Sequence, residues 1–412
     1  MKNKIIYTPP PDKSITIRWL VISSISNHKC IINNPLLADD TLNTIKTLKK
    51  LGVTIKIYKN KITVYGRDPY NFKKGKINVG ESALLLNLIL PILLNQKHIY
   101  TINGKKTILR RSFKETISAF KKIGGKIIHK NFKLPFKTFP SKFKYKIIKT
   151  SSAQVKSSIL IANVYQKIKI IEKLITRDHT EIILKYLGCK IKRKGSEIEI
   201  TNIKLNPKNI TIPGDISQAS VFITLSILKG DDITVKNCGI NLKRIGFLKK
   251  LREMGIIIKY TNIRKISGEK VANIHITPSK NIKGIIVKKD EIPFLIDEFM
   301  LLSLLLAKAQ RPSILYGVNR LKNKESNRLK ETIKILKKLG VKTISKKNSL
   351  IIYPSKEFKN PKIIDTKNDH RIAMLAGLLK KIFKDLKIIN PGCVKKTYPN
   401  FFNDLNKIYY QH

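Results

Sequence analysis

The sequence predicts a mixed α/β protein of two domains, each built from three copies of one repeated unit. The chain has 412 residues, of which 42% are hydrophobic, so it is long enough for two cores and apolar enough to fold. A helix that ends at glycine and runs into a β-rich stretch recurs at intervals of 64 to 85 residues. A second, more apolar helix precedes most of these points, which indicates a repeated α/β unit.

Five glycines mark the repeat, each directly after a basic helical stretch. Lys or Arg in the last turn complements the helix dipole, and glycine adopts the left-handed conformation that ends a helix. The β-branched residues that follow favour a strand. The five segments are KKLGVTIKIY at Gly52, KKIGGKIIHK at Gly124, KYLGCKIKRK at Gly188, REMGIIIKY at Gly255 and KKLGVKTIS at Gly340.

Strands and an apolar helix complete each predicted unit. VTIKIYKNKITVYG is typical of two strands joined by a turn at Lys59-Asn60, and FMLLSLLLAK is typical of a buried helix. A sixth, incomplete unit begins near Asp369. Six units divide into a first domain at 12–213 and a second domain at 1–11 with 214–412. The chain crosses between them at TPPPDKS and IPGDIS, where prolines and a glycine punctuate it.

Apolar runs and cysteines constrain the compartment. The longest apolar candidate, Ala83–Leu94, has 12 residues, too few to cross a bilayer, and is predicted to be a buried helix. The N-terminal stretch lacks the apolar core of a secretory signal, so we expect a cytoplasmic protein. The four cysteines are far apart and form no CxxC pair, so we expect buried thiols, with neither a zinc site nor a disulfide framework.

The net charge of +56 is extreme. Such a charge is compatible with a protein that binds nucleic acid or a membrane surface. The positive residues are nevertheless spread along the whole chain, and Lys, Ile and Asn, whose codons are rich in A and T, are abundant throughout. We therefore favour a biased genome as the cause. A general positive field would still attract small anionic substrates.

Two predicted helix starts combine hydroxyl, amide and basic residues. In TPPPDKSITIRW, Asp12, Lys13 and Ser14 precede a helix that carries Arg18. In KTSSAQVKSSILIA, Ser151, Ser152 and Gln154 precede an apolar helix. Exposed N–H groups at a helix start bind anions. A solvated helix start or a plain serine cap explains each segment equally well when it is taken alone.

Three further segments place charges beside apolar helices. Lys324 and Arg328 share one helix face in KNKESNRLKE, and Arg328 could grip a carboxylate or phosphate with two hydrogen bonds. Arg371 in NDHRIAML opens a buried helix and needs an anionic partner. Asp297 in IPFLIDEFMLL interrupts an apolar stretch. A carboxylate that is not paired in such a place is suited to act as a general base. A helix cap explains Asp297 equally well when the segment is taken alone.

Nine segments, taken in order from Lys13 to Phe402, resemble the motif series of the 5-enolpyruvylshikimate-3-phosphate synthase family. This resemblance implies an inside-out α/β barrel in each of the two domains, each made of three βαβαββ repeats. The active site would lie in the cleft between the domains, which close on substrate. The segments are DKSITIR, INGKKTILRRSF, TSSAQVKSSIL, TRDHTEIIL, IPGDISQAS, IPFLIDE, KNKESNRL, NDHRIAM and NPGCVKKTYPNFF.

The resemblance also implies a reaction in the shikimate pathway, towards chorismate and the aromatic amino acids. The enolpyruvyl group of phosphoenolpyruvate passes to the 5-hydroxyl of shikimate 3-phosphate, without metal or organic cofactor. The partners would be these two small molecules, with no nucleic acid and no membrane, and the protein would be a monomer.

Site residues follow from the same resemblance, position by position. Asp297, Glu325 and Lys13 would be catalytic. Shikimate 3-phosphate would contact Lys13, Ser14, Arg18, Ser152, Ala153, Gln154, Thr176, Arg177, Asp297, Arg320 and Lys324. Phosphoenolpyruvate would contact Lys13, Ala83, Arg111, Gln154, Arg328, Arg371 and Lys396.

The segment NVGESALLLN departs from the family pattern. One alignment puts Ala83 at the family glycine and Asn87 at a usual arginine, whereas a shifted alignment puts Gly80 and Leu84 there. The usual arginine is missing in both. In the first alignment, which we prefer, the Ala83 methyl group would narrow the phosphoenolpyruvate pocket. We therefore expect resistance to glyphosate, an analogue that fills the same space.

Three alternative interpretations fit the sequence less well. The sister enzyme that transfers enolpyruvyl to UDP-N-acetylglucosamine carries a Cys or Asp on the loop that matches INGKKTILRR, and no cysteine is present there. A nucleic-acid-binding protein would show clustered charge and stacking aromatics, but aromatics are 7% and no such module is found. An inactive scaffold would leave costly buried charges without a ligand.

Overall fold

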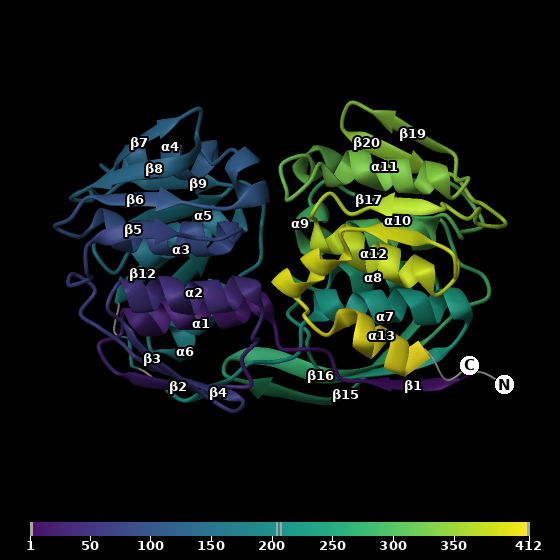
Figure 1. The fold of residues 1–412 in the computed structure, drawn as a ribbon, viewed down its shortest axis with the longest axis horizontal. Helices are drawn as coiled ribbons and strands as arrows, with labels where there is room; N and C mark the ends of the chain where they lie inside the picture. The colour runs from purple at the N-terminus through teal and green to yellow at the C-terminus, as the bar shows by residue number, and fades with distance from the viewer. Residues whose placement is uncertain (1–2, 203–204, 207, 410–412) are drawn as a thin grey trace. The chain divides into compact units, whose positions relative to one another are not determined.

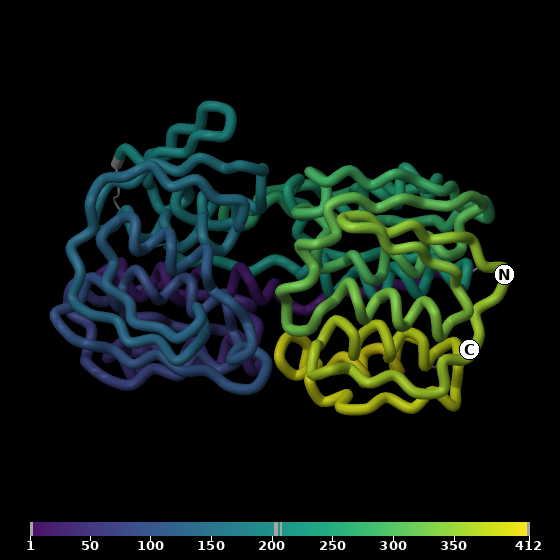
Figure 2. The backbone as a smooth tube through the Cα atoms, turned by 90° about the horizontal axis from the view of Figure 1, so that it is seen from above, coloured from purple at the N-terminus to yellow at the C-terminus, as the bar shows by residue number. Residues whose placement is uncertain are grey.

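The computed structural model describes residues 3–202, 205–206 and 208–409, and it divides the chain into two compact units. The N-terminal unit comprises Pro11–Ile212 and Lys265–Glu269, and the C-terminal unit comprises the other residues that the structure describes. Figure 1 labels the elements of each unit, and Figure 2 follows their backbones in a second view. The predicted domain limits include residues 1–2 and 410–412, which lie outside the described residues.

The N-terminal unit wraps three four-stranded sheets around three apolar helices. The strand orders are β13-β2-β4-β3, β5-β6-β8-β7 and β11-β12-β10-β9. The strands are β2 (Lys29–Asn33), β3 (Thr54–Tyr58), β4 (Lys61–Tyr65), β5 (Gly75–Asn78), β6 (Tyr100–Asn103), β7 (Lys126–Lys130), β8 (Lys133–Phe139), β9 (Ile147–Thr150), β10 (Lys169–Glu172), β11 (Lys190–Lys194), β12 (Glu197–Asn202) and β13 (Ile210–Thr211). The helices are α1 (Lys13–Ser24), α2 (Asp39–Lys50), α3 (Ala83–Leu94), α4 (Lys114–Lys122), α5 (Ala153–Ala162), α6 (His179–Tyr186) and the 3-10 helix η1 (Lys106–Arg110).

The C-terminal unit has the same plan with a reduced third sheet. Its strand orders are β1-β14-β16-β15, β17-β18-β20-β19 and β21-β22. The strands are β1 (Lys4–Tyr7), β14 (Asp232–Gly239), β15 (Ile257–Ile266), β16 (Glu269–Thr277), β17 (Ile286–Val287), β18 (Ser313–Tyr316), β19 (Thr343–Lys346), β20 (Ser349–Ile352), β21 (Ile363–Asp365) and β22 (Lys387–Ile389). The helices are α7 (Ile216–Lys229), α8 (Gly246–Glu253), α9 (Ile292–Leu295), α10 (Phe299–Leu306), α11 (Arg328–Lys338), α12 (His370–Lys380), α13 (Phe401–Tyr409) and the 3-10 helices η2 (Val318–Leu321) and η3 (Pro391–Lys396).

Each full repeat follows one strand pattern. In the second repeat β5 and β6 are parallel and joined through α3, and β7 and β8 then form an antiparallel hairpin that pairs with β6. A parallel pair needs a crossover connection, and here that crossover is the buried helix. The predicted βαβαββ unit is confirmed.

The five marker glycines end helices as predicted. Gly52, Gly124, Gly188, Gly255 and Gly340 all have positive φ, between 79° and 101°, and each lies between an amphipathic helix and an edge strand. The predicted turn at Lys59-Asn60 joins β3 to β4, and the predicted buried helix Ala83–Leu94 is α3.

Apolar helices form the centre of each unit. In the N-terminal unit α3 packs against α1 and α5, and in the C-terminal unit α7, α10 and α12 pack against one another. Every residue of α3 and α10 is buried, which explains why these segments lack a polar face. The buried apolar residues form two separate cores. Among the residues that the structure describes, no helix has both the length and the apolar character to cross a membrane.

The first repeat of each unit takes its first strand from a distant part of the chain. β13 pairs in parallel with β2 and leads into α7, whereas β1 pairs in parallel with β14 and leads into α1. The segment Lys265–Glu269 also belongs to the N-terminal unit, although its flanking strands β15 and β16 belong largely to the C-terminal unit. No sequence pattern indicates this further excursion between the units.

Candidate active site

The start of α1 carries Lys13 on a capped helix end. Asp12 caps the helix by accepting a hydrogen bond from the Ile15 amide at 2.8 Å. The Lys13 ammonium then forms an ion pair with Asp40 of α2 at 2.9 Å. Asp40 is buried, so this pair holds Lys13 in one place at the helix start.

Arg18 joins three helix segments of the N-terminal unit. Its guanidinium donates to Thr180 Oγ1 at 2.8 Å, to Ser157 Oγ at 3.2 Å and to the Ser14 carbonyl at 3.1 Å. These partners come from α6, α5 and α1, and Arg18 itself is only 3% exposed. Arg18 therefore fixes the predicted residue Ser14 relative to α5 and α6.

The start of α5 presents Ser152, Ala153 and Gln154. Ser152 is the N-cap and accepts from the Val155 amide at 3.4 Å. Gln154 Oε1 accepts a hydrogen bond of 3.2 Å from Nδ2 of Asn87, a residue of α3. Ala83 is the first residue of α3, four residues before Asn87, so the structure brings Ala83 and Gln154 together through Asn87.

A buried ion network holds the loop of Thr176 and Arg177. Glu172 Oε1 accepts from the Thr176 amide at 3.0 Å and from its hydroxyl at 2.7 Å. Lys156, which is fully buried, binds Glu172 at 2.9 Å and Glu181 at 2.7 Å. Burial alone would raise the pKa of Glu172, but Lys156 and the hydrogen bonds outweigh it and lower that pKa.

Sequence reasoning missed Lys156 and Glu172. One signal was present, because Lys156 is the single charge within the apolar stretch AQVKSSILIA. A charged residue in such a helix needs a buried partner. Arg111, the remaining predicted residue of this unit, follows η1 and is half-buried.

Arg328 is the centre of the charged cluster in the C-terminal unit. Its side chain donates to Asp369 through Nε at 2.9 Å and Nη2 at 3.1 Å, to Glu325 at 2.8 Å and to Asp297 at 3.2 Å. Burial would lower the pKa of Arg328, but the negative charges of Asp369, Glu325 and Asp297 raise it instead. Arg328 is therefore a permanent cation in the core of the unit.

Asp297 lies between two arginines. Oδ1 accepts from Arg328, and Oδ2 accepts from Arg244 at 3.1 Å. Arg244 also binds Asp215 at 3.2 Å and Ser217 Oγ at 2.7 Å. Both oxygens of Asp297 are therefore paired with an arginine. Sequence reasoning missed Arg244, which is one of many basic residues in NLKRIGFLKK.

The other predicted residues of this unit surround the cluster or lie on neighbouring elements. Asp369 caps α12 by accepting from the Arg371 amide at 2.9 Å. Arg371 Nη1 reaches the Ser217 carbonyl at 3.3 Å. Lys396 is buried at the end of η3. Arg320 lies in η2, and Lys324 is half-buried in the turn before α11.

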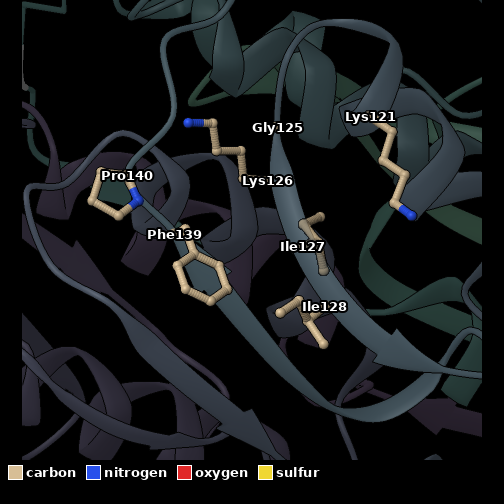
Figure 3. A pocket seen from close by; sticks show the side chains of 7 residues that line it. All are labelled: Lys121, Gly125, Lys126, Ile127, Ile128, Phe139 and Pro140. Atoms are coloured by element: carbon tan, nitrogen blue, oxygen red, sulfur yellow. The ribbon is translucent and has the colours of Figure 1, made fainter.

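A pocket of about 610 Å³ lies elsewhere, beside β7 and the end of α4. Figure 3 shows its lining. None of the predicted site residues belongs to that lining, which consists of Lys121, Gly125, Lys126, Ile127, Ile128, Phe139 and Pro140. Its charged lining residues are the two lysines.

Comparisons with known proteins identify the family of the chain. Residues 3–405 match the family model described as EPSP synthase (3-phosphoshikimate 1-carboxyvinyltransferase). A 3-phosphoshikimate 1-carboxyvinyltransferase of Thermoanaerobacter sp. (strain X514) is 35% identical over 98% of this chain and 97% of its own. One from Clostridium tetani (strain Massachusetts / E88) is 36% identical over 97% of this chain and 93% of its own.

Solved structures agree as well. An EPSP synthase structure from Acinetobacter baumannii superposes with a TM-score of 0.82 at 28% identity and covers 98% of this chain and 95% of that one. The repeated sheets, the charged clusters and these full-length matches lead to one conclusion. The chain belongs to the EPSP synthase family, which transfers the enolpyruvyl group of phosphoenolpyruvate to shikimate 3-phosphate.

Proposed function

We propose that Asp297 and Glu325 carry the proton transfers of this reaction and that Lys13 stabilises the charge that develops. Asp297 takes the proton of the substrate 5-hydroxyl as its oxygen bonds to C2 of phosphoenolpyruvate. C3 gains a proton from Glu325, which gives a tetrahedral intermediate. C3 then returns a proton, the C2–C3 double bond re-forms and phosphate leaves.

One observation supports this assignment above the others. Both carboxylates bind the same buried guanidinium, that of Arg328. This common partner keeps a base and an acid within one small cluster, as a reaction with two proton transfers needs. Arg244 holds the second oxygen of Asp297, so the carboxylate has a fixed orientation.

Arg328 also has capacity for a substrate anion. A guanidinium has five N–H donors. Two point to Asp369, one to Glu325 and one to Asp297, which leaves one donor on Nη1 by this count. We assign that donor to phosphoenolpyruvate, together with Arg371, Lys396 and Arg111. Arginine suits this role because it matches the planar carboxylate and the phosphate.

The groups of the N-terminal unit are assigned to shikimate 3-phosphate. The capped start of α5 offers backbone N–H groups and the hydroxyl of Ser152, and the loop of Thr176 and Arg177 adds a cation. Arg320 and Lys324 are assigned to the same substrate. Their positive charges offset the phosphate and the carboxylate of the acceptor.

Near-isosteric variants test the catalytic pair. Asp297→Asn and Glu325→Gln should each lower kcat by about a hundredfold or more while KM changes little, because proton transfer is lost and shape is kept. Glu253→Gln is the matched control, since Glu253 is exposed and pairs with Lys250 of the same helix, away from the predicted site residues. A kcat within tenfold of the parent enzyme in either site variant would remove that residue from the proposal.

A further inference from the structure

Asn87 is a buried residue of α3, and both donors and the oxygen of its side-chain amide have hydrogen-bond partners. Nδ2 donates to the Ala83 carbonyl at 2.8 Å and to Gln154 Oε1 at 3.2 Å. Oδ1 accepts from Thr116 Oγ1 at 2.7 Å. The side chain is 2% exposed. Two donors and one acceptor therefore all have partners inside the N-terminal unit.

The Ala83 carbonyl fixes which way this amide faces. A backbone carbonyl can only accept, so the Asn87 atom beside it must be Nδ2. The second Nδ2 hydrogen then points to Gln154, whose facing atom must in turn be an acceptor, Oε1. One backbone carbonyl thus sets the orientation of the Asn87 amide and, through it, that of the Gln154 amide. The orientation follows from donor and acceptor chemistry rather than from the placement of oxygen and nitrogen alone.

The consequence falls on the far side of Gln154. With Oε1 turned towards Asn87, Nε2 faces the other way and keeps both hydrogens. Within the part of the chain that the structure describes, Gln154 Nε2 has no hydrogen-bond partner, and Gln154 is only half-buried in the first turn of α5. Phosphates and carboxylates only accept hydrogen bonds, so an amide that presents Nε2 is ready for the two substrates, and one that presents Oε1 would repel them.

We propose that Asn87 is a positioning residue that locks the Gln154 amide with its N–H donors towards the substrates. This proposal rests on the assignment of Gln154 to the substrates under the proposed function. Asn87 touches no substrate in this account and acts only through Gln154.

The test is a double-mutant cycle on kcat/KM for shikimate 3-phosphate and for phosphoenolpyruvate. Asn87→Leu removes the donor without adding charge, so the Gln154 amide can turn over. We expect kcat/KM to fall about three- to tenfold, the effect of one neutral hydrogen bond. In a Gln154→Ala background, Asn87→Leu should not lower kcat/KM further, because the amide that Asn87 orients is absent. Asn87→Ala serves as a second variant if Leu does not fit.

Asn163→Leu is the matched control for this cycle. Asn163 lies at the other end of α5, is buried, and its Nδ2 also donates to a carbonyl four residues earlier, that of Ile159, at 2.9 Å. This control should lose stability but keep kcat/KM. If the losses of kcat/KM from Asn87→Leu and Gln154→Ala multiply in the double variant, Asn87 does not act through Gln154. That result would overturn the proposal for Asn87 and leave the role of Gln154 intact. A Gln154→Ala enzyme with unchanged kcat/KM would overturn both the positioning role of Asn87 and the assignment of Gln154 to the substrates.

Discussion

At the scale of single residues, each unit contains a buried network of charged groups beside predicted site residues. Arg328 with Asp369, and Lys156 with Glu172, are fully or almost fully buried pairs. Removal of one partner from such a pair leaves an uncompensated charge in a low-dielectric interior. The same partners hold residues assigned to substrates, so stability and function are coupled at these positions.

The Glu172 network makes stability depend on pH. The pKa of Glu172 is lowered in the folded protein, whereas an unfolded Glu titrates near about 4.3. As pH falls, the unfolded state takes up a proton first, so this contribution is complete above about pH 4.3 and is lost as the pH falls through the folded pKa. We expect Glu172→Gln to lose about 3 kcal/mol at pH 7 and to show a flatter stability profile between pH 6 and 3.

Urea unfolding at several pH values measures this difference. Glu199→Gln is the control, because Glu199 forms a partly exposed pair with Lys167 and should change stability little. Parallel pH profiles for the parent protein and Glu172→Gln would contradict the account.

Ala83 carries the expectation of glyphosate resistance. It is the first residue of α3 and is 4% exposed, so its methyl group lies against packed neighbours and has little room to move. We expect an inhibition midpoint well above the micromolar range, and Ala83→Gly should lower it by removing the methyl group. A midpoint already in the micromolar range for the parent enzyme would reject the expectation.

Site prediction from sequence succeeded where a motif was local and failed where partners were distant. The Asp369 cap of α12 was predictable because cap and helix are neighbours in sequence. Arg244 binds Asp297 from 53 residues away, and only the fold brings them together. In a chain with 83 basic residues, composition cannot single out one arginine.

At the scale of elements, the helix–glycine–strand pattern predicted most of the repeat. The pattern works because a left-handed glycine, basic residues in the last turn and β-branched residues after it each have a local physical cause. The order of strands within a sheet was not available from this pattern. That order depends on which hairpin pairs with which parallel strand, a non-local choice.

The marker glycines provide a stability test. Gly255 has φ of +90°, and an added Cβ would meet no atom closer than 3.6 Å, so the backbone conformation alone disfavours a side chain. Gly255→Ala should therefore cost about 1–2 kcal/mol. Gly75→Ala is the control, because Gly75 has no positive φ and its nearest contact would be 3.8 Å. Equal unfolding free energies for the two variants would contradict the role given to φ.

At the scale of the whole molecule, the two units share one plan and exchange connections. β13 completes the first sheet of one unit just before the chain enters the other, and β1 does the converse. The crossing near IPGDIS was suggested by its Pro-Gly pair. No sequence pattern suggested that Lys265–Glu269 belongs to the N-terminal unit. That placement depends on contacts between distant residues, such as the hydrogen bond of 2.7 Å between Glu269 and His179.

The net charge of +56 has a kinetic consequence for two anionic substrates. A positive field speeds their encounter with the protein, and salt screens that field over about 8 Å at physiological ionic strength. We expect kcat/KM for shikimate 3-phosphate to fall severalfold as sodium chloride rises from about 20 to about 150 mM, with kcat nearly constant. A kcat/KM that does not change with salt would show that the charge has no part in substrate capture.

The most direct test of the account is phosphate release from phosphoenolpyruvate by the purified chain, measured with each acceptor in turn. We predict release that depends on shikimate 3-phosphate, is absent with UDP-N-acetylglucosamine and disappears in Asp297→Ala and Glu325→Ala. Folded protein that releases no phosphate with shikimate 3-phosphate, or that prefers the nucleotide sugar, would contradict it.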